Sequence, residues 1–251
     1  MAADVRHRAL GAFVGVDVRN VGREGLLVVV LVAPLLLAVA LRAGYGPAEV
    51  WVRTTYGLGL AVHRPFILAA VVVLHLPLVY GMVGALLVFD DLDDGALRAL
   101  RMTPFTLERY LAYRLGAAGI VSLVALLVAV PLSGLAPWQR LGWLLPALAL
   151  AAACAPLVML AALAVAGNKI EGLTALKALG IPVMAPLAAW FVGGPWEAVL
   201  VPLPTYWPVR ALWAGMDGRL DVLAVGVGGP LIIVMGAGLL RRVRRRMTTR
   251  T

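Results

Sequence analysis

Long runs of apolar residues without a charged side chain recur along the chain. Six such runs cover residues 25–41, 65–89, 115–139, 141–168, 178–196 and 222–240. A helix needs about 20 apolar residues to cross the hydrocarbon core of a bilayer, so each run can span it, the first only just. Helices buried in soluble proteins rarely stay uncharged for so long. The pattern therefore predicts an all-α integral membrane fold, with six transmembrane helices in a single domain over residues 1–251.

Two proline-rich regions complicate this pattern. The fifth run contains Pro182 and Pro186 and ends in a Gly-Gly-Pro break at 193–195. Membrane helices tolerate proline where neighbouring helices satisfy the freed carbonyl groups, so we keep this run as a span. The apolar residues 198–209 are too few to cross a bilayer and include three prolines. We expect a re-entrant or surface element there.

Composition agrees with a membrane protein. The chain is 62% hydrophobic and 14% charged, whereas a soluble domain has roughly 45–50% apolar and about 25% charged residues. It has too few polar residues to cover a soluble globule, and it is too hydrophobic to be disordered. Cys154 is the only cysteine, which excludes an intrachain disulfide.

The basic residues predict the orientation, because cytoplasmic loops are enriched in Lys and Arg. With six spans, 16 of the 22 basic residues fall on one side: Arg6, Arg8, Arg19, Arg23, Arg98, Arg101, Arg109, Arg114, Lys169, Lys177, Arg241, Arg242, Arg244, Arg245, Arg246 and Arg250. We therefore expect a multi-pass cell-membrane protein with both termini in the cytoplasm. The arginines of the tail, residues 241–251, are explained by topology, so we expect membrane lipid and no nucleic acid as a partner.

The seven tryptophans support the same span count. All of them fall on or near the outer ends of the spans: Trp51, Trp138, Trp143, Trp190, Trp196, Trp207 and Trp213. Tryptophan favours the membrane interface because its ring is apolar and its single N–H seeks a polar partner. We expect interfacial anchoring for this set, including Trp207 and Trp213.

Two polar segments lie on the predicted cytoplasmic side. Residues 1–24 carry Leu10, Val14 and Val18 at helical spacing, which predicts an amphipathic interfacial helix, with a plain basic leader as the alternative. After the second span, Asp93 or Asp94 can cap a short helix that runs to about residue 102. Thr103-Pro104 would end that helix, and Thr106 would cap the next, so we expect a short helix between two spans, with a solvated connector as the alternative.

The loop also carries a recognisable motif. It reads acidic-x-x-acidic-Gly-(Thr/Ala)-Leu-x-x-Leu-x-x-Thr-Pro over residues 91–104, followed by Tyr-Leu at 110–111. Further signs are Asp-Val-Arg-Asn at 17–20, Pro34 inside the first run, residues 168–172 after the fourth and residues 204–208 before the last. Together these motifs resemble the ABC-2-type permeases, the transmembrane subunits of ATP-binding-cassette exporters. The nearest subgroup is the small drug exporters of the fluoroquinolone-exporter-like kind, and the likeness covers nearly the whole chain.

The resemblance implies a permease that works as a dimer, either a homodimer or a pair with a related permease, with separate ATP-binding-cassette ATPase subunits. It implies that the short helix after span two docks on an ATPase. The residues carried over to this coupling segment are Asp93, Asp94, Gly95, Leu97, Arg98, Leu100, Arg101, Thr103 and Pro104. A second cytoplasmic contact is expected at Asp17, Arg19, Arg23, Lys169 and Glu171, although the last two also suit ordinary flanking charge. Ala96 replaces the threonine that many relatives carry.

No Gly-x-x-x-x-Gly-Lys-(Ser/Thr) sequence occurs, so we expect no P-loop in this chain. ATP and Mg²⁺ would then be bound by the partner ATPase, and this chain would have no catalytic residue, metal or cofactor of its own. The expected function is export of an apolar or amphipathic compound, such as a drug, a lipid-like molecule or a secondary metabolite, by alternating access.

Two other functions fit parts of the sequence. Asp90, Asp91 and Asp94 match the Asp-Asp-x-x-Asp motif by which membrane prenyltransferases hold Mg²⁺ and a diphosphate. The second acidic pair, Asp217 and Asp221, falls on the other predicted side of the bilayer and cannot share that diphosphate. A membrane scaffold without transport activity is the other alternative.

His75 and Tyr80 lie inside the second run and are candidates for the substrate path. An ionisable group within a membrane helix is a functional candidate by default. A neutral histidine can equally bond to a neighbouring helix, which would make its role structural.

Overall fold

The computed structural model describes residues 25–95 and 106–249, and within these ranges the chain is helical and has no strand. The predicted interfacial helix (1–24) and coupling helix lie outside the described residues. The elements are α2 (Gly25–Tyr56), η1 (Leu60–His63), α3 (Arg64–Leu68), η2 (Ala69–Val73), α4 (His75–Asp93), α6 (Leu107–Ser133), η3 (Trp138–Arg140), α7 (Leu141–Val165), α8 (Lys169–Met184), η4 (Ala185–Trp190), η5 (Gly194–Val199), α9 (Tyr206–Met216) and α10 (Val222–Thr249). The predicted all-α fold is confirmed.

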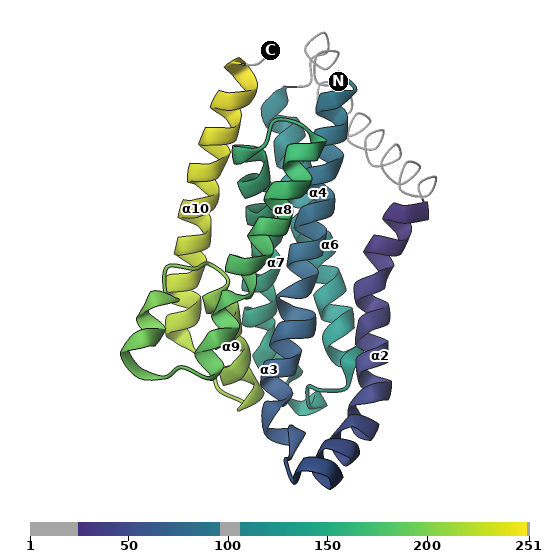
Figure 1. Ribbon diagram of the computed structural model, residues 1–251. Helices are drawn as coiled ribbons and strands as arrows, with labels where there is room; N and C mark the ends of the chain where they lie inside the picture. The colour runs from purple at the N-terminus through teal and green to yellow at the C-terminus, as the bar shows by residue number, and fades with distance from the viewer. Residues whose placement is uncertain (1–24, 96–105, 250–251) are drawn as a thin grey trace, which may run out of the picture.

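Six helical segments of this part are long and apolar enough to cross a membrane, and they run side by side as an upright bundle (Figure 1). They are Val28–Tyr56, Leu60–Asp93, Leu107–Ser133, Trp138–Val165, Lys169–Trp190 and Val222–Met247. The predicted number of spans is confirmed. The second is composite, because α3 passes through the π-helical turn η2 into α4, with Leu74 N–H bonded to Ala69 O at 2.9 Å.

Helix α7 forms the centre of the bundle and packs against α4, α6, α9 and α10. Most of its side chains are buried, and many are alanine or leucine. The crossing with α4 is close, since a Cβ atom added to Gly81 would lie 2.5 Å from Ala155 O. Small residues at such a crossing let two membrane helices approach closely. Close packing matters in a bilayer, because the hydrophobic effect does not drive helices together there and van der Waals contacts must do so.

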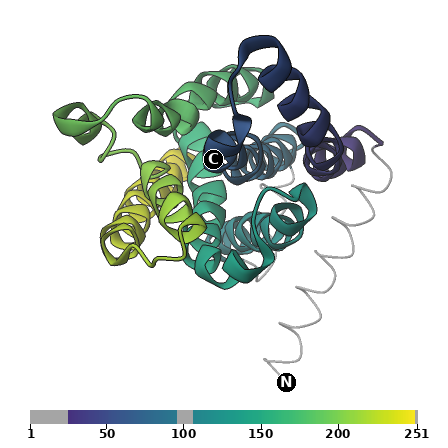
Figure 2. The same cartoon turned by 90° about the horizontal axis from the view of Figure 1, so that it is seen from below.

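Helix α2 lies at the rim of the bundle, as Figure 2 shows from below. It continues well past the uncharged run 25–41 and ends only at Tyr56, with Pro34 and Pro47 inside it. Most of its described side chains are exposed. One contact to the bundle is the hydroxyl of Tyr80 in α4, which donates to Leu31 O at 2.9 Å.

The region expected to be re-entrant or at the surface contains turns followed by α9, which packs against α7 and α10. Tyr206 and Trp207 are 1% and 3% exposed. Interfacial anchoring by Trp207 is therefore wrong. Its ring packs inside the protein because the indole N–H has a partner there, Val201 O at 3.1 Å. Gly228 of α10 makes room for it, since a Cβ atom at that glycine would lie 2.4 Å from Trp207 Cβ.

The last helix continues through the basic tail. Helix α10 extends from Val222 to Thr249, and the side chains of Val243 and Met247 are buried between the arginines. They belong to the same apolar cluster as Phe89 and Leu111. The part of α10 beyond the predicted span is thus packed onto the bundle.

Candidate functional site

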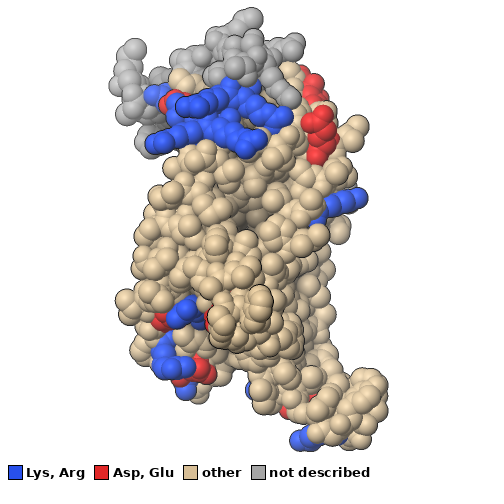
Figure 3. Space-filling view, turned by 60° about the vertical axis from the view of Figure 1, so that its left-hand side comes forward, with Lys and Arg blue, Asp and Glu red and all other residues tan. Residues whose placement is uncertain are grey.

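The end of α4 carries the acidic cluster, and its side chains bind two other elements, α6 and α8, at one end of the bundle. We call this the basic end; it holds the end of α4, the starts of α6 and α8, and the arginines of α10 (Figures 1 and 3). Asp94 caps α4 and its N–H bonds to Asp90 O at 2.9 Å. Gly95 follows with φ +72°, a left-handed conformation that glycine adopts at little cost.

The start of α8 is held by α4. Asp90 Oδ1 lies 2.6 Å from Lys169 Nζ, and Asp93 Oδ2 accepts the backbone N–H of Lys169 at 3.1 Å. That N–H is one of the first four of α8, which have no partner within the helix. A carboxylate at this position also suits the positive end of the helix dipole. Asp93 therefore acts as a cap supplied by another span.

The residues of α8 complete this cap. Asn168 Oδ1 accepts the N–H of Glu171 at 2.9 Å, and Glu171 Oε2 accepts the N–H of Gly167 at 2.7 Å. This arrangement resembles a capping box, with the N–H of Gly167 in place of the N–H of the N-cap residue Asn168. The next residue, Gly172, lies against the ring of Phe89 in α4, since a Cβ atom there would be 2.3 Å from Phe89 Cε2. The α4–α8 contact thus combines one ion pair and one hydrogen bond with a close apolar approach.

Helix α6 is held by a third carboxylate of the cluster, that of Asp91. Asp91 Oδ2 lies 2.7 Å from Arg114 Nη2 and also accepts the hydroxyl of Tyr110. The guanidinium Nε of Arg114 donates to the same hydroxyl at 3.2 Å. Arg114 is 7% exposed, so its charge is nearly removed from water. Such a charge requires its counter-ion, because leaving it unpaired is costly.

Helix α10 joins the same end through its tail. Arg244 pairs with Glu108 near the start of α6, and Arg246 Nη1 donates to Ala166 O, just after α7, at 3.2 Å. The side chains of the basic end therefore connect α4, α6, α8 and α10 and the end of α7. We call these contacts the polar network. It borders the segment 96–105, where the coupling helix is expected.

Comparison with known proteins identifies the family. Residues 17–240 match the family described as "Fluoroquinolones export permease protein Rv2686c-like". The chain belongs to this family. Two relatives from Mycobacterium tuberculosis, strains CDC 1551 / Oshkosh and ATCC 25618 / H37Rv, are named fluoroquinolones export permease proteins. Each is 33% identical over 211 residues, which cover 84% of this chain and 84% of the relative. No solved structure matches.

Membership of the Rv2686c-like family confirms the resemblance to small ABC-2-type drug-exporter permeases. The protein is a multi-pass membrane permease. The structure brings Asp93, Lys169 and Glu171 together, with Asp94 and Gly95 next to them. The other predicted contact residues lie outside the described residues: Asp17, Arg19, Arg23, Leu97, Arg98, Leu100, Arg101, Thr103 and Pro104. Thr106 is confirmed as the cap of α6, accepting the N–H of Arg109 at 3.4 Å.

Sequence reasoning missed the part of this permease's polar network that involves Tyr110 and Arg114. Arg114 was counted only as a flanking charge for the third span. A usable signal was present, because Tyr110 and Arg114 are four residues apart and therefore share one face of a helix. Their partner, Asp91, was considered only as part of an acidic motif.

The same contacts bear on the magnesium-site alternative. Asp90 and Asp91 face cations on two different helices, Lys169 of α8 and Arg114 of α6. In the described residues of the permease, no group of three His, Cys, Asp or Glu side chains is placed to hold a metal ion. Asp217 and Asp221 lie at the opposite end, where Asp221 binds Arg210 with a distance of 2.7 Å between Oδ2 and Nε.

The substrate-path candidates His75 and Tyr80 lie near the start of α4, whereas the polar network is at the end of that helix. Tyr80 is 4% exposed and its hydroxyl is bonded to α2 through Leu31 O, a structural contact. His75 is half-buried and is the first residue of α4 after the π-helical turn. Within the part of the chain that the structure describes, its ring has no hydrogen bond or ion pair.

A second polar cluster stabilises the opposite end of the permease. Arg210 of α9 binds Asp221 and donates to the hydroxyl of Tyr206 at 3.3 Å, and this hydroxyl donates to Glu197 of η5. Asp221 also accepts the N–H of Ala224 at 2.9 Å, at the start of α10. Burial alone would raise the pKa of Asp221, but the hydrogen bonds from Arg210 and Ala224 outweigh it and lower the pKa below its usual value.

Proposed function

We propose that this permease is the membrane-spanning subunit of an ATP-driven exporter that moves an apolar or amphipathic compound out of the cell. Membership of the Rv2686c-like family carries this proposal. The names of the two relatives suggest a fluoroquinolone-type compound as the first substrate to test.

In this proposal the ATP is hydrolysed by separate ATP-binding-cassette subunits, which also bind Mg²⁺. They would contact the permease at the coupling segment 93–104, at the predicted interfacial helix and near Lys169 and Glu171. The polar network supports this placement. A displacement of the residues after Gly95 would act on the end of α4, which is bonded to α8 through Asp90 and Asp93 and to α6 through Asp91. Three spans would therefore respond to one contact.

The transport step is proposed to be alternating access in a dimer, with both termini and the basic end in the cytoplasm. ATP binding can drive such a switch only through different affinities for the two states. The clustering of Lys and Arg at the basic end in Figure 3 agrees with the orientation expected from the positive-inside rule. His75 stays a candidate on the substrate path, since its ring is half-buried and lacks a partner among the described residues.

The test is to express the permease together with a candidate ATP-binding-cassette ATPase subunit in a host that lacks its own drug efflux. Cells with both subunits should accumulate several-fold less of a fluorescent fluoroquinolone than cells with either subunit alone. An ATPase whose P-loop lysine is replaced by alanine is the matched control, because it keeps the complex and loses hydrolysis. Equal accumulation in all strains, with the complex still co-purifying, would favour the non-transporting scaffold.

A further inference from the structure

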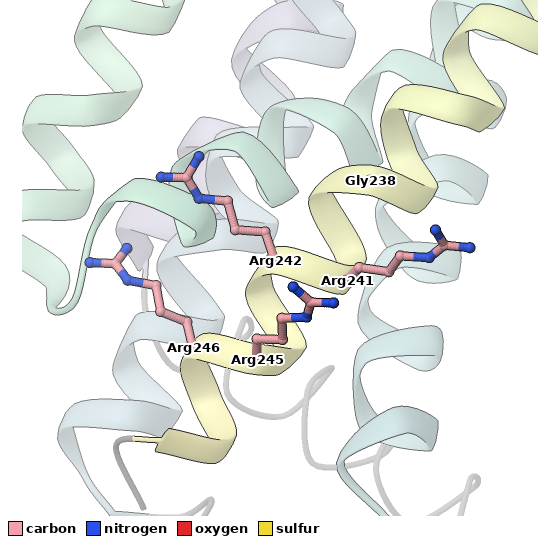
Figure 4. A pocket seen from close by; sticks show the side chains of 5 residues that line it. All are labelled: Gly238, Arg241, Arg242, Arg245 and Arg246. Atoms are coloured by element: carbon pink, nitrogen blue, oxygen red, sulfur yellow. The ribbon is translucent and has the colours of Figure 1, made fainter.

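The two ends of the bundle are held together by different chemistry. The basic end is rich in charge, and Figure 4 shows four arginines of α10 there: Arg241, Arg242, Arg245 and Arg246. The opposite end, which we call the aromatic end, holds a cluster made of His63, Phe66, Trp190, Phe191 and Trp213. These residues come from η1, α3, η4 and α9, with Phe191 directly after η4. The aromatic cluster therefore joins the second and fifth spans to α9.

The fifth span is attached to the second span near both of its ends. At the basic end, α8 begins on the carboxylates of α4. At the aromatic end, η4 finishes with Trp190 inside the aromatic cluster. Between these ends the α-helical form is lost, because α8 ends at Met184, with Pro182 before that point and Pro186 after it. Proline has no N–H for a helical bond, so the position of η4 depends on its contacts with the aromatic cluster.

Two indole N–H groups make hydrogen bonds within this part of the molecule. Trp213 of α9 donates to Pro65 O of α3, with 3.3 Å between the two atoms. Trp190 of η4 donates to Nδ1 of His63 in η1, with 3.2 Å between the two nitrogens. The two indole rings are also in edge contact, with centroids 5.1 Å apart. The two donors are thus alike, but only the second acceptor can take up a proton.

The bond between Trp190 and His63 requires a neutral imidazole. The indole N–H can only donate, so Nδ1 of His63 must offer a lone pair and the ring proton must be on Nε2. A protonated imidazole is a donor at both nitrogens. Two N–H groups would then face each other across the space of one hydrogen bond. Protonation of His63 therefore removes this contact, whereas the bond from Trp213 to a backbone carbonyl is unaffected.

The neighbouring elements contain other titratable and charged groups. They are Arg64 of α3, Tyr45, Glu49, Arg53 and Tyr56 in the last turns of α2, and Tyr206 and Arg210 of α9. Element η4 has none. Arg64 Nε donates to the Tyr45 hydroxyl at 3.1 Å, and Arg64 Nη2 lies 3.5 Å from Glu49 Oε2. Within the part of the chain that the structure describes, His63 forms no ion pair, so no bonded carboxylate offsets the loss of the indole contact.

We propose that the hydrogen bond between Trp190 and His63 is a proton-sensitive latch that holds the aromatic end of the fifth span on the second span. Histidine is the side chain that ordinarily changes its charge between about pH 5 and 8. His63 is half-buried and precedes the uncharged run 65–89, so a proton from solution can reach it. Acid on the side that the aromatic end faces releases η4 from η1, while Trp213 keeps α9 on α3.

The latch has a consequence for transport, which rests on the function proposed above. With the basic end in the cytoplasm, the aromatic end faces the outside of the cell. Release of η4 then favours the state in which the fifth span is open to the outside. The basic end is held by ion pairs and a helix cap, so the two attachments of the fifth span respond to different signals.

The test measures the distance between the two spans in the purified full-length permease, without an ATPase. Cys154→Ala removes the only cysteine, and spin labels are then attached through Val62→Cys in η1 and Ala188→Cys in η4, both at exposed positions. Double electron–electron resonance in lipid nanodiscs gives the distance distribution at about pH 7.5 and about pH 5, on either side of the histidine range. A monodisperse size-exclusion profile confirms that each variant is folded.

Three variants separate the latch from ordinary packing. His63→Asn is the main variant, because its amide oxygen can accept the indole N–H at either pH. Trp190→Phe removes the donor of the latch and keeps an aromatic ring. Trp213→Phe is the matched control, since it removes the same kind of donor from a bond whose acceptor, Pro65 O, does not titrate.

We expect acid to shift the wild type and Trp213→Phe toward longer distances, with the latch equilibrium changing about tenfold. His63→Asn should keep the neutral distribution at both pH values, and Trp190→Phe should show the acidic distribution at both. A wild-type distribution that is the same at both pH values would overturn the latch. A pH response retained by His63→Asn would also overturn it, because another group would then be responsible. No ATPase or substrate is present, so these results do not depend on the outcome of the efflux test.

Discussion

Arg114 of α6 and Asp91 of α4 form an ion pair in which Nη2 lies 2.7 Å from Oδ2, and the arginine side chain is only 8% exposed. The hydroxyl of Tyr110 bonds to both residues. A charge that is so nearly excluded from water needs its partner, and the pair therefore fixes the end of the second span against the start of the third.

We predict that Arg114→Met lowers the free energy of unfolding by roughly 2 kcal/mol, because it leaves Asp91 without its cation. The expected loss in the free energy of unfolding is smaller than for a fully buried ion pair, because the side chain of Asp91 is 28% exposed. Thermal melting of the purified protein in detergent measures it. Arg109→Met, at an exposed position of the same helix, is the control. Adding Asp91→Asn to Arg114→Met should restore part of the loss, and a wild-type melting curve for Arg114→Met would contradict the role of the pair.

Two glycines of α8 should respond in opposite ways to the same substitution. A methyl group at Gly172 would lie 2.3 Å from Phe89 Cε2, whereas Gly180 has nothing within 4 Å of that position. We predict that Gly172→Ala destabilises the protein by about 1–3 kcal/mol through overpacking. Gly180→Ala should be neutral or stabilise it by up to about 1 kcal/mol, because alanine has the higher helix propensity. The α4–α8 contact would be misplaced if both variants unfolded at the same temperature.

The conformation of Gly95 predicts an effect on coupling. Its φ of +72° costs a β-branched residue about 1–2 kcal/mol, whereas asparagine tolerates it better. We expect Gly95→Val to change the path of the chain into the coupling segment and to reduce efflux several-fold, with ATP hydrolysis continuing. Gly95→Asn should transport nearly as well as the wild type. Drug accumulation and ATPase activity are measured together in the two-subunit complex, and full transport by Gly95→Val would argue against a coupling role here.

Stability in acid should depend on Asp221. Its pKa is lower in the folded protein than in the unfolded chain, so its ionised form stabilises the fold. This contribution is present above the usual aspartate pKa of about 4 and is lost as the pH falls through the lower folded value. We predict that Asp221→Asn lowers the melting temperature at pH 7 and weakens its dependence on pH below about 4. Asp217→Asn is the control, because Asp217 is exposed and pairs with Arg219, which is also exposed. An unchanged acid profile for Asp221→Asn would refute the assignment.

The number of spans could be predicted from the sequence because absence of charge over about 20 residues is a local property. The end of α2 could not, since Arg42, Glu49 and Arg53 interrupt the apolar run while the helix continues to Tyr56. The burial of α9 was hidden by Pro208 and the two prolines before the helix, and by tryptophans that resemble interfacial anchors.

The candidate site was predictable only in part. The acidic cluster and Lys169 were noticeable because charge is scarce in this chain. Which carboxylate meets which cation depends on how α4, α6 and α8 are rotated about their axes, and a linear pattern does not contain that information. For this reason Asp93 was expected in the coupling helix, whereas the structure also shows it as a cap for α8.

The burial of Val243 and Met247 matters for anyone who attaches a reporter to this protein. A fusion placed directly after Leu240, where the apolar run ends, would remove two side chains that pack with Phe89 and Leu111 and would expose the apolar surface they cover. A measurement on such a fusion would therefore describe a destabilised protein. Tags for topology mapping or for purification should therefore be joined after the last helical turn.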